Sequence, residues 1–494
     1  MIMPTSGHDL LKTVPSGDLL VGGERVHDTT AGSREQLDPS TGRRLATVSL
    51  AGPSEIDTAV HSARDAQQEW LGLSPAQRRD VILRFAQLLD DCHEEMSILR
   101  SLELGAPMKK RRGANMAVEY MRYFAGWVDK LEGSTIPVHP GLALDYTVPE
   151  PYGTVAAITP WNGGVVSAAM KAIPALVAGN TVVVKPSELA VLSLLRFGEL
   201  GLAAGLPPGA LNIVPGAADA GQALVTHPGI DKISFTGGSA TAREVLRGAA
   251  TNLTPVILEL GGKSASIVFE DADIDTAVAT TVGLALATMS GQGCVLPTRL
   301  VAHDTVYDAV EQRVVEAASS LVVGRAFDEG VQIGPVITEA ACERIIGEVE
   351  AAASRGDGRL LTGGARLGGD LADGFFVEPT VFGNVDNSSP IARTEIFGPV
   401  LSLIRFGDEA EALSIANDNP YGLGGLVFTR DVARAHRVAG RLQAGSVGVN
   451  AFAPMPASAP FGGVKQSGYG REGGLAGVEE FLRPKNVYVD LSGP

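Results

Sequence analysis

Apolar positions in the first part of the chain recur with the spacing of helices. In residues 54–70 they fall at Ile56, Ala59 and Ala63, which is one face of a helix, and Ser54 is of a type that commonly caps a helix. The stretch before it, DPSTGRRLATVSLAG, reads as a short strand pair. We therefore predict a strand pair and then helices, up to about residue 130.

From Tyr152 the pattern changes to short, unbroken apolar runs rich in β-branched residues. The runs are TVAAIT, TVVVK, LNIV, KISFT and PVILEL. Such runs are typical of buried parallel strands, and the segments between them are long enough for crossover helices. We predict a doubly wound, Rossmann-like sheet over residues 153–261. Such sheets bind ligands at the carboxyl ends of their strands, and a dinucleotide is the expected ligand.

After Gly262 the alternation of strand and helix begins again. The run SASIVF precedes an Ala, Leu and Thr-rich segment, residues 275–288, which we expect to be a smooth helix, and a further strand and helix follow. The expected fold class is therefore α/β, with a cofactor domain of residues 1–130 and 152–261 and an α/β catalytic domain of residues 262–477.

Two segments outside these units alternate like exposed strands. The final run, KNVYVDL, reads as an edge strand, and residues 136–148 resemble another extended arm. We predict that residues 131–151 and 478–494 pair with each other as a small β arm. Because an exposed strand edge invites another chain, the arm predicts a homodimer or homotetramer.

Composition excludes several classes of partner. The formal net charge of −16 argues against nucleic-acid binding, and we interpret the one basic cluster, KKRRG at residues 109–113, as a solvated face. There is neither a secretory signal nor a continuous apolar run of membrane-spanning length, so we expect no membrane partner and a cytoplasmic protein. Three widely spaced cysteines form neither a disulfide framework nor a zinc-ligand set, and no metal is expected.

Two motifs look like nucleotide signatures and fail on context. Residues 468–473 match GxGxxG, yet they follow KQS and not a strand, with too little chain left for a βαβ unit. Residues 261–264, GGKS, end like a phosphate-binding loop, but Ile257 stands where its first glycine is required. We discard both as nucleotide sites.

Cys294 ends the stretch MSGQGC and is a candidate nucleophile. An arbitrary cysteine is more often a small packed hydrophobe. A thiol becomes a nucleophile when it is partly exposed and a base or a positive field favours the thiolate. Gly291 and Gly293 would allow close backbone approach, so that N–H groups could face a developing oxyanion.

Glu259 is the candidate base. It stands near the end of the apolar run VILEL and is followed by two glycines. A carboxylate there would be partly desolvated, which raises its pKa and makes it a competent general base. Alone, such a residue would more often be a strand-end charge that reaches water, so the pairing with Cys294 carries the hypothesis.

Seven motifs in order along the chain resemble the aldehyde dehydrogenase superfamily. They are PWN, KPSE, FTGGSATA, ELGGKS, GQGC, EIFGPV and PFGGVKQSGYGRE. The resemblance covers nearly the whole chain, from DPSTG to the final strand, and several independent motifs keep the family spacing.

The resemblance implies a set of catalytic roles. Cys294 would attack the aldehyde carbon, and the side-chain amide of Asn162, with the N–H of Cys294, would hold the oxyanion. Glu259 would activate the water that hydrolyses the thioester. Glu472 and Lys171 match residues assigned to proton transfer, although a plain ion pair for the first and a structural role for the second stay equally open.

The resemblance also implies a cofactor site. Lys185 and Glu188 would hold the adenine ribose, and a carboxylate accepts hydrogen bonds from both ribose hydroxyls but repels a 2′-phosphate, so NAD is expected and NADP is less so. Glycines at helix starts suit a pyrophosphate. The remaining expected cofactor residues are Ile158, Pro160, Trp161, Gly216, Gly221, Phe235, Gly237, Gly238, Leu260, Glu395 and Phe397.

The resemblance places the substrate entry beside Asn162 and Cys294. No arginine stands among the expected lining positions, which weakens the case for a substrate carboxylate. We therefore expect an apolar aldehyde, aliphatic, terpenoid or aromatic. The alternatives are a semialdehyde or coenzyme-A-acylating dehydrogenase and a catalytically silent homologue. The expected lining residues are Val166, Ser167, Met170, Phe452, Met455 and Phe461.

The sequence departs from the commonest family pattern at a few positions. Ser290 stands where asparagine is frequent, Gly238 replaces a serine that often contacts phosphate, and Ala242 replaces a frequent glycine. Gly163 and Gly164 follow Asn162 in place of bulkier residues, which would widen the entry or admit a neighbouring side chain.

Overall fold

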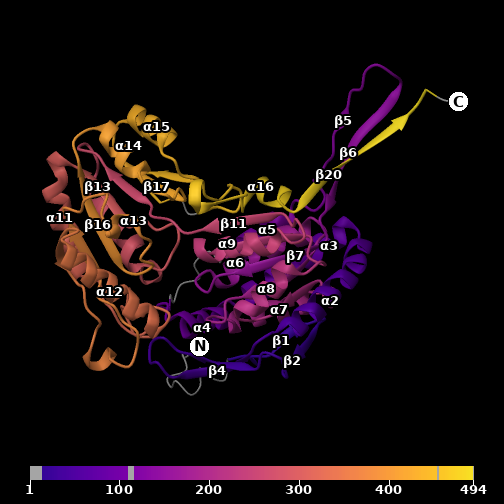
Figure 1. Ribbon diagram of the computed structural model, residues 1–494, viewed down its shortest axis with the longest axis horizontal. Coiled ribbons are helices and arrows are strands. Elements are labelled where there is room, and N and C mark those ends of the chain that lie inside the picture. The colour runs from indigo at the N-terminus through magenta and orange to yellow at the C-terminus, as the bar shows by residue number, and fades with distance from the viewer. Residues whose placement is uncertain (1–13, 109–115, 453–454, 493–494) are drawn as a thin grey trace.

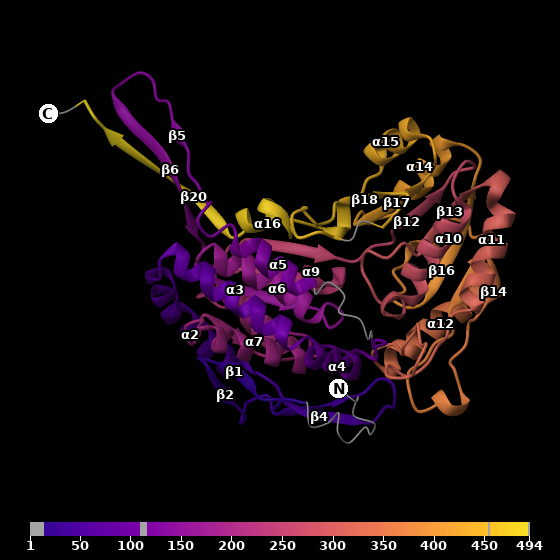
Figure 2. The ribbon, with the colours of Figure 1, turned by 180° about the vertical axis from the view of Figure 1, so that it is seen from behind.

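Two sheets with helices packed on their faces form the two main bodies of the molecule, and a narrow β arm projects from the first (Figure 1). The computed structural model describes residues 14–108, 116–452 and 455–492. The basic cluster that we interpreted as a solvated face lies outside these residues. Seen from behind, the chain leaves the first body for the second at the end of β11, Val256–Leu260, which is a strand of the first sheet (Figure 2).

The five predicted apolar runs are five neighbouring strands of the first sheet. Its order is β19-β11-β10-β7-β8-β9-β1-β2, and the β11-β10-β7-β8-β9 part is parallel throughout. The predicted doubly wound sheet is therefore confirmed. Its strands and crossover helices are β7 Thr154–Thr159, α6 Gly164–Val177, β8 Thr181–Pro186, α7 Leu192–Ala204, β9 Leu211–Ile213, α8 Ala218–Thr226, β10 Lys232–Gly237 and α9 Ser239–Ala249.

The N-terminal segment completes this body with two short strand pairs and four helices. Its elements are β1 Leu19–Val21, β2 Glu24–Val26, β3 Ser33–Leu37, β4 Arg44–Ser49, α2 Pro53–Gly72, α3 Pro75–Asp91, α4 His93–Leu104 and α5 Met116–Ala125. The prediction that Ser54 caps α2 is wrong. The cap is Gly52, two residues earlier, because Pro53 suits the first helical position, and the N–H of Gly52 donates to Glu55 Oε2 at 2.7 Å.

The second sheet, β14-β15-β16-β13-β12-β17-β18, is parallel except for its β14 edge. Its elements are β12 Ala265–Val268, β13 Arg299–His303, α11 Asp304–Ser319, α12 Glu339–Arg355, β14 Arg359–Thr362, β15 Thr380–Gly383, α13 Pro390–Arg393, β16 Val400–Phe406, α14 Glu409–Asn417, β17 Gly424–Phe428, α15 Val432–Arg441 and β18 Ser446–Val449.

The apolar segment before Cys294 is not the smooth helix that we expected. The α-helix α10 spans only Ile274–Val282. It is followed by a π-helical turn, Gly283–Ala287, and then by a 3₁₀ turn, Thr288–Gly291. By length and composition alone Ile274–Gly291 could cross a membrane. Because α10 packs on α11 and β12, a core helix is the better description.

After the second sheet the chain returns to the first. The helix α16, Gly474–Glu479, packs near α6, and β19, Gly468–Tyr469, pairs antiparallel with β11. The first body thus includes residues that we assigned to the second unit. The glycine-rich motif at 468–473 is an edge of this sheet: a Cβ on Gly468 would lie 1.9 Å from the carbonyl oxygen of Leu258.

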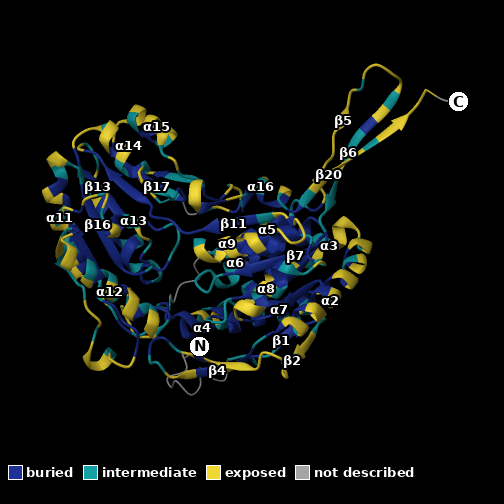
Figure 3. Cartoon of the chain, in the orientation of Figure 1, coloured by how far each residue is buried: buried dark blue, intermediate teal, exposed yellow. Residues whose placement is uncertain are grey.

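The predicted pairing of the two outlying segments is confirmed. The strands β6, Ala143–Pro151, and β20, Leu482–Asp490, pair antiparallel along their whole length, and β5, Thr135–Ile136, adds a short third strand. In contrast to the buried sheets, the arm is largely exposed (Figure 3). Its exposed apolar side chains include Leu142, Leu144, Tyr488, Val489 and Leu491.

Candidate active site

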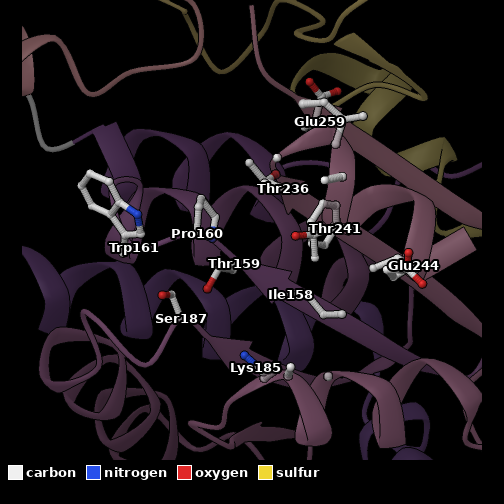
Figure 4. Close-up of a pocket in the computed structure, with 18 of the residues that line it drawn as sticks. Ile158, Thr159, Pro160, Trp161, Lys185, Ser187, Thr236, Thr241, Glu244 and Glu259 are labelled. Atoms are coloured by element: carbon white, nitrogen blue, oxygen red, sulfur yellow. The ribbon is translucent and has the colours of Figure 1, made fainter. Parts of the chain in front are cut away.

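A cavity of about 950 Å³ lies at the carboxyl ends of β7, β8, β10 and β11. Glu259 lies at one end of it and Lys185 at the opposite end (Figure 4). This is where a doubly wound sheet binds a dinucleotide, and the volume suits a ligand of that size. Of the thirteen expected cofactor residues, all but Gly216 line the cavity.

Gly216 has a structural role at the turn after β9. A Cβ there would lie 2.4 Å from the side chain of Ala220, so only glycine fits. The sequence reasoning missed several lining residues that follow the same strands or begin α8 and α9. The sequence signal that could have found them is their position, after the end of a predicted strand or near the start of the helix that follows it. They are Thr159, Ser187, Asp219, Gln222, Thr236, Thr241 and Glu244.

The Lys185 end of the cavity carries charged groups from two directions. Lys185 is buried, its Nζ donates to the carbonyl oxygen of Pro186 at 3.1 Å, and desolvation lowers its pKa. The Glu188 carboxylate, which lines the cavity, lies 3.8 Å from the guanidinium of Arg34 in β3. Arg34 was not predicted, because only the fold brings β3 beside the end of β8.

The other end of the cavity is closed by aromatic rings and a carboxyl group. The rings of Trp161 and Phe397 meet edge to face, with centroids 5.6 Å apart. Glu395 Oε1 accepts a hydrogen bond of 3.2 Å from the N–H of Gly262. Burial nevertheless raises the pKa of Glu395 to about 7.

The two glycines after β11 allow three functional groups to converge. A Cβ on Gly261 would lie 1.9 Å from Glu395 Oε2, and one on Gly262 would lie 2.6 Å from the carbonyl oxygen of Cys294. Both residues must therefore lack a side chain for this approach. The end of β11 thus brings Glu259, Glu395 and Cys294 to one place.

The turn that carries Cys294 is left-handed over three residues. Met289 and Ser290 have φ values of 49° and 54°, and Gly291 has 72°. A Cβ on Gly291 would lie 2.2 Å from the carbonyl oxygen of Gly398, so this glycine serves both its backbone angle and a close approach. The hydroxyl of Ser290 donates to the carbonyl oxygen of Gly334 at 2.9 Å and helps to hold the turn.

Cys294 is half-buried and its thiol is surrounded by carboxyl groups, not by cations. Desolvation, then the neighbouring Glu395 and Glu259, raise the pKa of Cys294 to about 12. A positive field therefore does not activate this thiol in the protein alone, and its proton must pass to a base.

Asn162 lies at the N-terminal side of α6, next to this turn. Its Nδ2 donates to the main-chain carbonyl of Gln292 at 2.8 Å. The adjacent Gly163 has room only for a hydrogen atom, because a Cβ would lie 2.6 Å from the Cβ of Ser167. We expected these glycines either to widen the entry or to admit a neighbouring side chain. The second is the case at Gly163, where the Ser167 side chain fills the space, whereas Gly164 faces open space.

Glu259 lies in β11 between Thr236 of β10 and Gly468 of β19. Only 3% of its surface is exposed, and neither carboxylate oxygen has a hydrogen-bond partner in the described residues. The predicted desolvation is thus confirmed. It raises the pKa well above the ordinary value, the nearby Glu472 raises it further, and Lys171 opposes the shift.

Lys171 and Glu472 form an ion pair with each other in the interior. The Lys171 side chain is fully buried, and its Nζ also donates to the hydroxyl of Ser234 at 3.1 Å. Of the two roles expected for Glu472, the ion pair is present. Because Glu472 also raises the pKa of Glu259, a part in proton transfer is compatible with that ion pair.

The expected substrate residues do not form one group. Met170 and Phe461 belong to the large apolar cluster of the first body, and Val166, Met455 and Cys294 pack against it. Ser167 is buried on the same helix as Met170, whereas Phe452 packs on the core of the second sheet.

A second cavity, of about 380 Å³, opens on the side of Asn162 away from β11 and is lined by Val166, Gly163 and Gly164. Its walls also hold Arg122, which pairs with Asp90 at 3.2 Å, and Arg100. These arginines come from α4 and α5, so a search of positions near the motifs missed them.

The described residues gather three potential metal ligands, Asp57, His61 and His227, at one surface point. His227 Nδ1 accepts from the N–H of Gly229 at 2.9 Å, and its Nε2 lies 3.1 Å from Asp57 Oδ1. The neutral ring must therefore carry its proton on Nε2, which leaves no lone pair there for a metal ion.

Comparison with known proteins points to one family. The model of the aldehyde dehydrogenase family matches residues 26–487. Similar solved structures include an aldehyde dehydrogenase from Bacillus cereus in complex with NAD⁺, with 34% identity, 100% of both chains covered and a TM-score of 0.94. PnpE from Pseudomonas sp. WBC-3 is 38% identical, with 97% and 99% covered and a TM-score of 0.94. Betaine aldehyde dehydrogenase from Staphylococcus aureus in complex with NAD⁺ is 34% identical, with 99% and 98% covered and a TM-score of 0.95.

Proposed function

The chain belongs to the aldehyde dehydrogenase family, and from this premise we propose that it oxidises an aldehyde to a carboxylic acid with NAD as the hydride acceptor. The observation that carries the proposal is the convergence of Cys294, Glu259 and Glu395 at the end of β11, beside a cavity of dinucleotide size. Aldehyde, water and NAD⁺ give acid, NADH and a proton.

Cys294 supplies the nucleophile in the proposed mechanism. The thiol proton passes to solvent water as sulfur attacks the aldehyde carbon, and Glu259, whose raised pKa suits a general base, is kept for the hydrolytic step. The oxyanion is held by the free N–H of the Asn162 amide and by the Cys294 main-chain N–H. NAD would supply the hydride acceptor when bound, and Cys294 would then carry the oxidised carbon as a thioester.

Glu259 acts after hydride transfer, on water. Its carboxylate is buried and free of hydrogen-bond partners in the described residues, so it can accept a proton from the water that attacks the thioester. The presence of this base disfavours a coenzyme-A-acylating enzyme, which needs no hydrolytic water. The triad of Cys294, Asn162 and Glu259 likewise disfavours a silent homologue.

Carboxylates in the cavity support NAD over NADP. Glu188, Asp219 and Glu244 all line it, and each would repel a 2′-phosphate. Lys185 and Glu188 would hold the adenine ribose, the α9 N-terminus with the open Gly238 would face the pyrophosphate, and Glu395 would accept from the nicotinamide ribose.

For the substrate we propose an apolar aldehyde. The support is the apolar cluster around Cys294, to which Met170, Phe461, Val166 and Met455 contribute. One observation favours a second candidate, an aldehyde with a distal carboxylate: Arg100 lines the cavity beside Asn162 and makes no hydrogen bond or ion pair with the described residues.

We further propose a homodimer or homotetramer built through the arm, and a reducing, cytoplasmic location. Exposed apolar side chains on β6 and β20 support the first. The three cysteines, all free, support the second.

A panel of aldehydes tests the function. Purified protein with NAD should give the near-ultraviolet absorbance of NADH, and kcat/KM should rank apolar aldehydes above ω-carboxylated ones. Cys294→Ala should abolish the signal and keep NAD binding, whereas Cys92→Ala, at the remote junction of α3 and α4, should remain active. A reversed ranking would favour the carboxylated class, and wild-type silence throughout the panel would favour the silent homologue.

A further inference from the structure

Gln292 is a buried amide inside the turn that ends at Cys294. It is 2% exposed, and none of its polar groups lacks a partner. Its Oε1 accepts from the N–H of Ile337 at 3.0 Å, and its Nε2 donates to the carbonyl oxygen of Met289 at 3.0 Å. The main-chain N–H of Gln292 donates to the same Met289 carbonyl at 3.0 Å.

These bonds fix the turn at a place where the backbone alone would not choose its shape. Met289 and Ser290 are left-handed without being glycine, a conformation that persists only when the surroundings impose it. Gln292 ties the carbonyl of Met289 from one side and the loop at Ile337 from the other. These hydrogen bonds of Gln292 therefore set the path of the backbone that leads to Cys294.

The main-chain carbonyl of Gln292 also holds Asn162, by accepting from Asn162 Nδ2 at 2.8 Å. An amide nitrogen carries two hydrogens in a plane. With one hydrogen bound to Gln292, the plane of the amide is fixed and so is the direction of the second hydrogen. Gln292 therefore positions both donors that would face an oxyanion, which are the Asn162 amide and the Cys294 N–H.

We propose that Gln292 is the positioning residue of the oxyanion site, aligning the Asn162 amide with the main-chain N–H of Cys294. The proposal rests on the proposed function, since it concerns the site where the aldehyde oxygen would become negative. Gln292 contacts no reacting atom and acts through its neighbours. A glutamate of the same shape could still accept from Ile337 but could not donate to Met289.

Two reactions of Cys294 separate positioning from general damage to the fold. Cleavage of p-nitrophenyl acetate by a thiol passes through an oxyanion, whereas alkylation by iodoacetamide is a direct displacement without one. We expect Gln292→Glu to lower kcat/KM for aldehyde oxidation and for ester cleavage by about tenfold or more, as loss of oxyanion support does. The alkylation rate should stay close to that of the wild type, whereas the melting temperature should fall because the substitution buries a carboxylate.

Ser290→Ala is the matched control, because the Ser290 hydroxyl ties the same turn to Gly334, whereas Asn162 is hydrogen-bonded to Gln292. We expect it to change ester cleavage and alkylation by the same factor. Equal losses of both reactions in Gln292→Glu, or no loss in either, would overturn the proposal.

A second measurement covers a variant that folds poorly. In an Asn162→Ala background, Gln292→Glu should cost much less ester cleavage than it costs in the wild type, because the residue it positions has gone. Additive losses would contradict the proposal. If wild-type protein cleaves the ester but oxidises no aldehyde, the proposed function fails while the result for Gln292 still stands.

Discussion

Lys171 and Glu472, 301 positions apart, form an ion pair that water cannot reach. Removing one member of such a pair leaves an uncompensated charge in the interior. Lys171→Met should therefore reduce the free energy of unfolding by about 3–5 kcal/mol, measured by denaturant titration. Lys485→Met, which breaks the exposed pair with Glu150, should cost no more than about 1 kcal/mol. Equal costs would mean that burial does not govern the Lys171 pair.

Glu259→Gln should separate the two halves of the reaction. An amide cannot take a proton from water, so steady-state turnover should fall by about 10²-fold or more. A single-turnover burst of NADH should remain. Stopped-flow and steady-state assays of the same preparation provide the comparison, and loss of the burst would assign Glu259 a part before hydride transfer.

The pH dependence of turnover should also report Glu259. Its pKa is raised, and only the ionised form is a base, so wild-type turnover should increase as the pH rises through that raised value. In Glu259→Gln this limb of the profile should be absent. A limb that survives the substitution would belong to another group.

Glu395 should make NAD binding depend on pH near neutrality. Its pKa in the free protein is about 7, above the ordinary value of 4.5, and only the carboxylate form accepts two ribose hydroxyl hydrogens. Deprotonation on raising the pH from about 6 to about 8 should therefore lower the Kd for NAD, as measured by calorimetry. Glu395→Gln should bind more weakly with a flatter profile. A wild-type Kd that rises with pH would contradict the role given to this carboxylate.

Arg34 and Glu188 should control the choice of cofactor in opposite directions. Glu188→Gln removes the charge that repels a 2′-phosphate and leaves Arg34 without its carboxylate, so kcat/KM with NADP should rise relative to NAD by about tenfold. Arg34→Gln should strengthen the preference for NAD. In the double variant the gain with NADP should shrink, and an undiminished gain would show that Arg34 does not meet the phosphate.

The arm should govern oligomerisation. Leu144 and Val489 are partners in register between β6 and β20, and each exposes about two fifths of its surface. Leu144→Asp and Val489→Asp should lower the mass measured by light scattering, because a charge opposes burial at an interface. Leu253→Asp, on an exposed turn of the first body, is the control. An unchanged mass in the arm variants would exclude this surface as the contact.

The sequence predicted the features that depend on neighbours along the chain. The apolar runs of β7 to β11 are strands because each is short, β-branched and bounded by turns, and β6 and β20 pair as their alternation indicated. It singled out Cys294 and Glu259 from their local context and Asn162 from motif resemblance, and their catalytic roles stay predictions. The helix cap was misplaced by two residues because Ser54 and Pro53 are competing local signals.

Contacts between distant segments could not be predicted in the same way. Nothing in MSGQGC indicates that Met289 is left-handed, because that conformation is imposed by Gln292, Ile337 and Gly398 together. Arg34 beside Glu188 and Arg100 beside Asn162 depend on how whole helices and strands pack. The raised pKa of Cys294 likewise results from burial and then from carboxylates contributed by separate elements.

The position of β19 has a consequence for the growing chain on the ribosome. The strand β11, which carries Glu259, pairs on one edge with β10. Its other edge pairs with residues 468–469, which come more than two hundred positions later in the chain. Until that segment emerges, β11 presents an open edge to other nascent chains, and such edges promote mispairing. A ribosome stalled within the second sheet would therefore hold a chain whose β11 edge is still unpaired.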